Sequence, residues 1–138
     1  MNLEESIEII ESGYEFLLAY AAQGRPAGAE TGPGPHARPT IEGMATAMKF
    51  IAEALVNGQS DFEQVIAEDC RKAGAAVGYM LDQGQIGSEM VDNLNASIHL
   101  RAVLTDLFLY SEVLEPLGTQ EGEATAESMA YDATKTSQ

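Results

Sequence analysis

The chain has one cysteine, no apolar run long enough to cross a membrane, and no secretion signal at its start. A single cysteine excludes an internal disulfide and a zinc site built from cysteines. A membrane-spanning helix needs about 20 consecutive, mostly apolar residues, and acids or glycines interrupt every candidate stretch. The opening residues Met-Asn-Leu-Glu-Glu lack the basic start and apolar run of a signal peptide. We therefore expect a protein of the reducing cytoplasm.

Basic residues are also scarce. Seven Lys and Arg stand against 22 Asp and Glu, which gives the chain a formal net charge of −15. Such a charge repels nucleic-acid phosphate and anionic membrane surfaces, so we expect neither as a partner. It favours solubility and basic protein partners. A salt-adapted host and a mimic of nucleic acid are two further explanations of the acidity that composition leaves open.

The motifs of common catalytic and cofactor sites are missing as well. The sequence has no Gly-rich phosphate loop with a lysine, no G-x-S-x-G and no H-E-x-x-H. A di-iron bundle needs Glu-x-x-His motifs on two helices. His99 instead has Ala96 three positions before it, and His36 lies in a proline-rich loop. We therefore predict no metal and no cofactor, and we favour a protein that is not an enzyme.

What the chain does have is an apolar residue every three or four positions in four stretches, near residues 3–23, 41–56, 61–83 and 89–114. This periodicity is typical of helices that bury one face. We predict an all-α four-helix bundle formed by a single domain over 1–117, followed by a flexible acidic tail over 118–138. The first stretch shows the pattern best, at Leu3, Ile7, Ile10, Tyr14, Leu17 and Ala21.

Capping residues mark where these helices begin. Asn2 with Glu5 and Ser60 with Glu63 have the spacing of capping boxes. Thr40 and Ser88 are the expected caps of the second and fourth helices. The short Asn-Gly turn after the second helix predicts that the second and third helices form an antiparallel hairpin.

Residues 24–40 contain four prolines and four glycines, so we expect a long crossover loop there. Its length allows the first two helices to run parallel or antiparallel. Arg25, His36 and Arg38 make this the only net-basic segment of the chain. They are candidates for gripping an anion or an acidic partner, with a plain solvated crossover as the alternative.

The fourth predicted helix carries a line of polar residues at spacings of three, four or seven positions, which places them on roughly one side. One interpretation is a polar pocket with His99, Asp106 and Tyr110 as candidate catalytic or ligand groups. The other is a single wet stripe on a mostly buried helix. Arg101 is the natural partner for an acid on a neighbouring helix. The line comprises Asp92, Asn95, His99, Asp106 and Tyr110.

Two further features suggest contact with another protein. The second half of the fourth helix is apolar nearly all round and includes Phe108. Gly74 and Gly78 lie one turn apart on the third helix, where we expect a close approach by another helix. The hypothesis is therefore a non-catalytic binding or assembly module, acting as a homodimer or as an accessory subunit. The alternative is an enzyme or small-molecule binder with a pocket between helices around His99 and Asp106.

Overall fold

The structure is a computed structural model that describes residues 1–28 and 36–118, with side chains described as far as residue 114. It confirms the all-helical class, and the described residues contain no strand. None of the described helices is both long and apolar enough to cross a membrane. The helices are α1 (Leu3–Ala22), α2 (Ala37–Leu55), α3 (Asp61–Leu81), α4 (Ser88–Ala96) and α5 (Ile98–Gly118).

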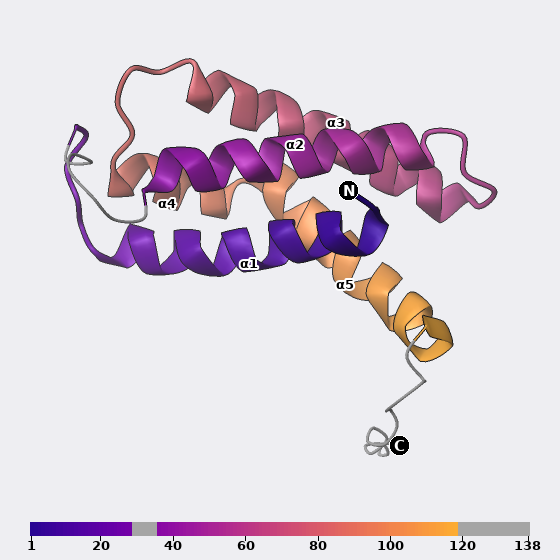
Figure 1. The fold of residues 1–138 in the computed structure, drawn as a ribbon. Coiled ribbons are helices and arrows are strands. Elements are labelled where there is room, and N and C mark those ends of the chain that lie inside the picture. Colours follow the sequence, from indigo (N-terminus) through magenta and orange to yellow (C-terminus); the bar gives the residue numbers. More distant parts are fainter. Residues whose placement is uncertain (29–35, 119–138) are drawn as a thin grey trace. The chain divides into compact units, whose positions relative to one another are not determined.

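Contacts divide the chain into two compact units, residues 1–104 and residues 105–138. In the first unit α1 and α2 lie side by side and run in opposite directions, which settles a question that the sequence left open (Figure 1). The helices α2 and α3 form the expected antiparallel hairpin, and α4 packs on α1. The second unit comprises the rest of α5 and the residues that follow, and most of the predicted tail lies outside the described residues.

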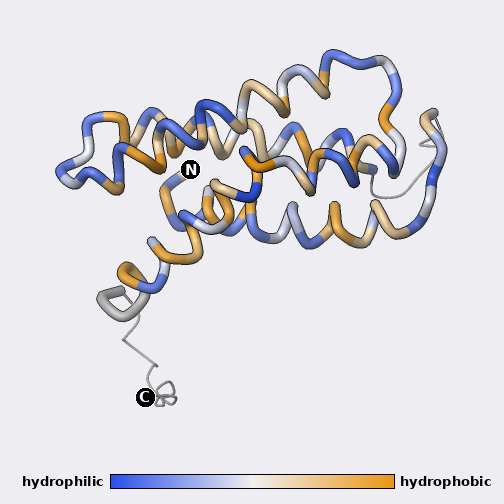
Figure 2. The backbone as a smooth tube through the Cα atoms, turned by 180° about the vertical axis from the view of Figure 1, so that it is seen from behind, coloured by the Kyte–Doolittle hydropathy of each residue, from blue (hydrophilic) through white to orange (hydrophobic). Residues whose placement is uncertain are grey.

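The core of the first unit follows the apolar periodicity. Figure 2 shows hydrophobic and hydrophilic positions alternating along its helices. In α1 the side chains of Ile7, Ile10 and Leu17 are buried as predicted, and Tyr20 joins them. On α2, five apolar residues spaced three or four positions apart are all buried. They are Ile41, Met44, Met48, Ile51 and Leu55.

Both predicted capping boxes are present. The backbone N–H of Glu5 donates to Oδ1 of Asn2 (2.8 Å), and the N–H of Asn2 donates to Oε1 of Glu5 (3.1 Å). The N–H of Glu63 donates to Oγ of Ser60 (3.1 Å), and the N–H of Ser60 donates back to Oε1 of Glu63 (3.4 Å). Each box provides partners for backbone groups that the first helical turn leaves exposed.

The predicted helix 89–114 is wrong, because two helices occupy this stretch. Ser97 takes an extended backbone conformation (φ −60°, ψ 132°) and donates its N–H to the carbonyl of Leu94 (3.0 Å). Its Oγ accepts from the N–H of His99 (3.2 Å), and its carbonyl accepts from the N–H of Arg101 (3.0 Å). One residue therefore ends α4 and begins α5. The helix α5 also continues beyond the expected end at residue 114.

Two predicted caps are wrong. The helix α2 begins at Ala37 with His36 as its N-cap, so Thr40 lies inside the first turn and donates to the carbonyl of His36 (3.3 Å). Pro39 fits within that turn because its missing N–H would have no partner inside the helix. The crossover is consequently shorter than expected. Gly87 rather than Ser88 is the N-cap of α4.

Candidate docking groove

The helix break at Ser97 separates the polar line that the sequence predicted. Asp92 and Asn95 lie on α4, whereas His99 lies on α5. His99 is exposed and lines neither of the two hollows described below. Asn95 is buried and donates to the carbonyl of Leu17 (3.1 Å), so it ties α4 to α1. A pocket around His99 and Asp106 stays a prediction.

The remaining candidates from that line belong to α5. Asp106 and Tyr110 are partly buried and lie in the second unit. Phe108 is in the same unit and is 54% exposed. Arg101 is exposed in the first unit. The catalytic or partner-binding roles predicted for these residues stay predictions.

The basic residues of the crossover take part in the packing of the fold. Arg38 donates from Nη1 to the carbonyl of Leu81 (2.8 Å) and from Nη2 to the carbonyl of Gln83 (2.6 Å). A cation at this position also suits the negative end of the α3 dipole. His36 is half-buried at the start of α2. Gripping of an anion by these side chains stays a prediction.

Arg25 lies beside a hollow of about 630 Å³ where α1 ends and α4 begins. Its guanidinium carbon is 5.4 Å from the ring centroid of Tyr20. Ser88 is buried at this junction, and its hydroxyl (Oγ) donates to the carbonyl of Tyr20 (2.7 Å). The backbone N–H of Arg25 donates to the same Oγ (2.7 Å), and its carbonyl accepts from the N–H of Ser88 (2.8 Å). These bonds join two helices and leave Ser88 no capping role.

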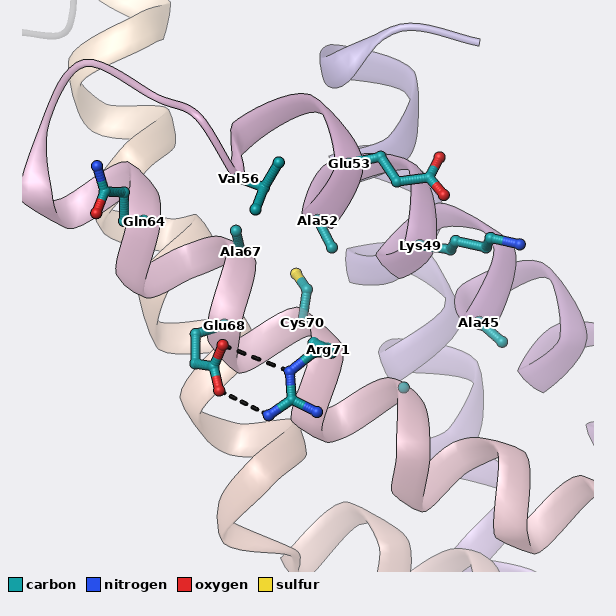
Figure 3. A pocket seen from close by; sticks show the side chains of 11 residues that line it. Ala45, Lys49, Ala52, Glu53, Val56, Gln64, Ala67, Glu68, Cys70 and Arg71 are labelled. Carbon is teal, nitrogen blue, oxygen red and sulfur yellow. Dashed lines mark hydrogen bonds and ion pairs between the residues drawn. The ribbon is translucent and has the colours of Figure 1, made fainter.

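A larger groove of about 770 Å³ runs between α2 and α3 (Figure 3). The α2 wall is formed by residues spaced four, three, one and three positions apart, which lie on one face of a helix. They are Ala45, Lys49, Ala52, Glu53 and Val56. The wall alternates small floor residues with charged residues at the rim.

The α3 wall repeats this arrangement in the opposite direction. Its members share one helical face, apart from Cys70, which lies deeper. They are Gln64, Ala67, Glu68, Cys70, Arg71 and Gly74. Ala67 and Cys70 are buried, and the sulfur of Cys70 points from α3 toward the α2 side (Figure 3). The floor of the groove is therefore small and apolar.

The glycines of α3 leave this face uncovered. A Cβ built on Gly74 or on Gly78 meets no atom within 4 Å among the described residues. The close helix approach expected at these two glycines is therefore absent from the described part of the chain. Gly13 on α1 shows the contrast, since a Cβ there would lie 2.7 Å from Met44.

The rim of the groove carries both signs of charge. On α3 the guanidinium of Arg71 donates to both carboxylate oxygens of Glu68, at 2.6 and 3.4 Å. This hydrogen-bonded pair lowers the pKa of Glu68 and raises that of Arg71. On α2 the exposed Lys49 and Glu53 lie one helical turn apart. The lining residues thus carry two bases and two acids.

The small residues of α3 are evident in the sequence, but the groove is not. The missing signal was the second row, in which Ala45 and Ala52 lie seven residues apart on α2, as Ala67 and Gly74 do on α3. Only the pairing of the two helices shows that these rows border the same groove. The described residues contain no cluster of His, Cys, Asp or Glu that could hold a metal ion. Comparisons with protein-family models, with curated proteins and with solved structures find no match to the chain.

Proposed function

We propose that this protein is a non-catalytic binding module that receives a helix of a protein partner in the groove between α2 and α3. The observation that carries the proposal is the open space at Gly74, which lines the groove on its α3 side. A glycine inside a helix costs about 1 kcal/mol relative to alanine. No side chain of the described residues fills the space beside Gly74, and this space is open to a partner.

The spacing of the small residues along both walls suits a helix. Helices pack at interaxial distances of roughly 8–10 Å, and small residues at the contact favour the shorter end. The floor residues Ala45 and Ala52 are two turns apart, and so are Ala67 and Gly74 on the facing wall. A partner helix with apolar side chains at positions i, i+3 or i+4 and i+7 presents knobs at matching intervals.

The rim adds selectivity to this apolar contact. Lys49 and Arg71 attract acids on the partner, and Glu53 and Glu68 attract bases. Such rim charges chiefly affect orientation and the rate of association. A module of this kind acts as an accessory subunit or in self-association. We assign it to the cytoplasm because its single thiol suits a reducing compartment.

The test is selection of helical peptides from a displayed library on the full-length protein, followed by affinity measurement on variants. Ala52→Leu fills the floor of the groove, and Ala54→Leu makes the same change at an exposed position of α2 outside it. We expect the dissociation constant of the selected peptides to rise about tenfold in Ala52→Leu, because the added side chain occupies the space of the partner. Ala54→Leu should bind like the parent protein.

Thermal unfolding of each variant shows whether the fold is intact. Ala45→Leu is the second filling variant, and it replaces Ala52→Leu in the comparison should the latter unfold. The proposal would be overturned if neither Ala52→Leu nor Ala45→Leu changed the dissociation constant of the peptides. It would also be overturned if Ala54→Leu raised that constant by as much as they do.

A further inference from the structure

We infer that the helix received by this groove belongs to a second copy of the chain, so that two groove faces meet across a two-fold axis. This inference rests on the proposed function and names the partner. It follows from the distribution of charge around the groove.

The charges that line the groove balance one another. The chain has a formal net charge of −15, so two copies repel each other over most of their surfaces. In the groove lining, however, Lys49 and Arg71 balance Glu53 and Glu68. Contact through this face brings two copies together where the charges of the lining residues sum to zero. Salt screens the repulsion between the remaining acids of the two copies, because the Debye length is about 8 Å at physiological ionic strength.

The α2 side of the groove is complementary in charge to a second copy of itself. In a two-fold contact, residue i of one copy meets residue j of the other and j meets i. Lys49 and Glu53 are exposed, opposite in charge and one turn apart on α2. When two copies of α2 cross antiparallel at this point, each Lys49 faces the Glu53 of the other copy. If positions 49 and 53 carried charges of the same sign, the two copies of α2 would repel each other here.

The small side chains of the α2 wall leave room for a second copy. Ala45 and Ala52 flank the charged pair on the same face, and their small side chains allow two α2 helices to approach closely. Val56 is 57% exposed at the end of this row and is covered when the two faces meet. On the other wall Glu68 and Arg71 already neutralise each other. The dimer contact therefore has an apolar centre and a charged rim.

The experiment is sedimentation equilibrium of the full-length protein at physiological salt, from roughly 1 to 300 μM, which spans the dissociation constants of weak and moderate dimers. We expect a concentration-dependent dimer. Lys49→Glu should raise its dissociation constant at least about tenfold, and so should Glu53→Lys, because each places like charges opposite one another. The double variant Lys49→Glu/Glu53→Lys should restore dimerisation to within about twofold of the parent, since the swap rebuilds both ion pairs.

The matched control is Lys72→Glu, which makes the same charge change at an exposed position of α3 that does not line the groove. It should leave the dimer almost unchanged. The three positions, Lys49, Glu53 and Lys72, are solvent-exposed, and circular dichroism checks that each variant remains helical.

Each other result overturns the inference. If the protein is a monomer at every concentration, the inference is wrong, and the peptide experiment still tests the proposed function. Peptides that bind a monomeric protein identify a foreign helix as the partner. A dimer that ignores the single variants, or is not restored by the swap, joins the copies through another surface. A protein that stays monomeric and also selects no groove-binding peptide would overturn the proposed function as well.

Discussion

At the scale of single residues, a few polar side chains join helices that hydrophobic burial alone brings together. Ser88 is 3% exposed and bonds to the carbonyl of Tyr20 and to the backbone N–H of Arg25 through its hydroxyl. Both backbone groups lie where α1 ends, and the last carbonyls of a helix lack partners within it. The carbonyl of Tyr20 also accepts from the N–H of Gln23 (3.1 Å), so Ser88 adds a second bond to this carbonyl and gives the N–H of Arg25 its partner.

Ser88→Ala should consequently lower the free energy of unfolding by about 2 kcal/mol, because it removes the hydroxyl bond to Tyr20 and leaves the N–H of Arg25 without its partner in a part-buried junction. Urea denaturation measures the change. Ser12→Ala is the control, since Ser12 is exposed on α1 and donates only to the carbonyl of Glu8 (2.8 Å). That variant should be neutral within about 0.5 kcal/mol. Equal effects of the two changes would refute the role given to Ser88.

The carboxylate of Glu68 provides a second test at this scale. Its pKa lies below the ordinary value because Arg71 donates hydrogen bonds to it and because the charges of Arg71 and Lys72 favour the ionised form. Arg71→Gln should raise the pKa of Glu68, and a carboxyl-carbon NMR titration measures the shift. Since folding lowers this pKa, its contribution to stability is present above the ordinary carboxyl range and is lost as the pH falls through the folded value. An unchanged titration in Arg71→Gln would show that the pair does not form in solution.

At the scale of elements, glycines distinguish helix faces that are covered from faces that are open. The Cβ of an alanine at position 13 would lie 2.7 Å from Cγ and Sδ of Met44, because α1 and α2 pack closely there. The same atom at position 74 meets nothing within 4 Å among the described residues. The two glycines look alike in sequence and differ in what faces them.

Gly74→Ala should therefore stabilise the protein by about 1 kcal/mol, which is the difference in helix propensity. Gly13→Ala should not show this gain, because Met44 must move to admit the new methyl group. Chemical denaturation of the two variants side by side measures both effects. A similar gain at both positions would mean that α1 and α2 are not as close as the structure has them.

The ends of the helices show both what the sequence predicts well and what it does not predict. The boxes at Asn2 and Ser60 were predicted because their partners lie three residues away. The break at Ser97 was missed because apolar residues continue at helical spacing on both sides of it. A serine at this point is itself a capping signal, since its hydroxyl can accept an N–H of the next turn.

At the scale of the whole molecule, net charge opposes the compact state. Glu4, Glu8 and Glu15 are exposed along α1, and Glu11 lies partly buried between them. Each like-charge pair one turn apart is unfavourable by a few tenths of a kcal/mol. Salt weakens such repulsion, because the Debye length falls to about 10 Å at an ionic strength of 0.1 M and shortens further as salt is added.

Added sodium chloride should therefore raise the melting temperature, by about 3–5 °C for a stabilisation near 1 kcal/mol. Differential scanning calorimetry at low and high salt measures the shift. Near the sequence isoelectric point of about 4.2 the net charge vanishes, and the effect of salt should shrink accordingly. A melting temperature that falls with salt at neutral pH would contradict this account.

The sequence by itself determined the helical class, most helix positions, the two capping boxes and the inward rows of α2. Each depends on residues within about one or two turns of each other, where the period of 3.6 residues translates directly into a shared face. Only the tertiary structure decided that α1 and α2 are antiparallel, that Ser88 and Arg38 bond to distant carbonyls, and that α2 and α3 leave a groove between them. These features depend on pairs of rows from different helices, and their register is set by how the helices pack.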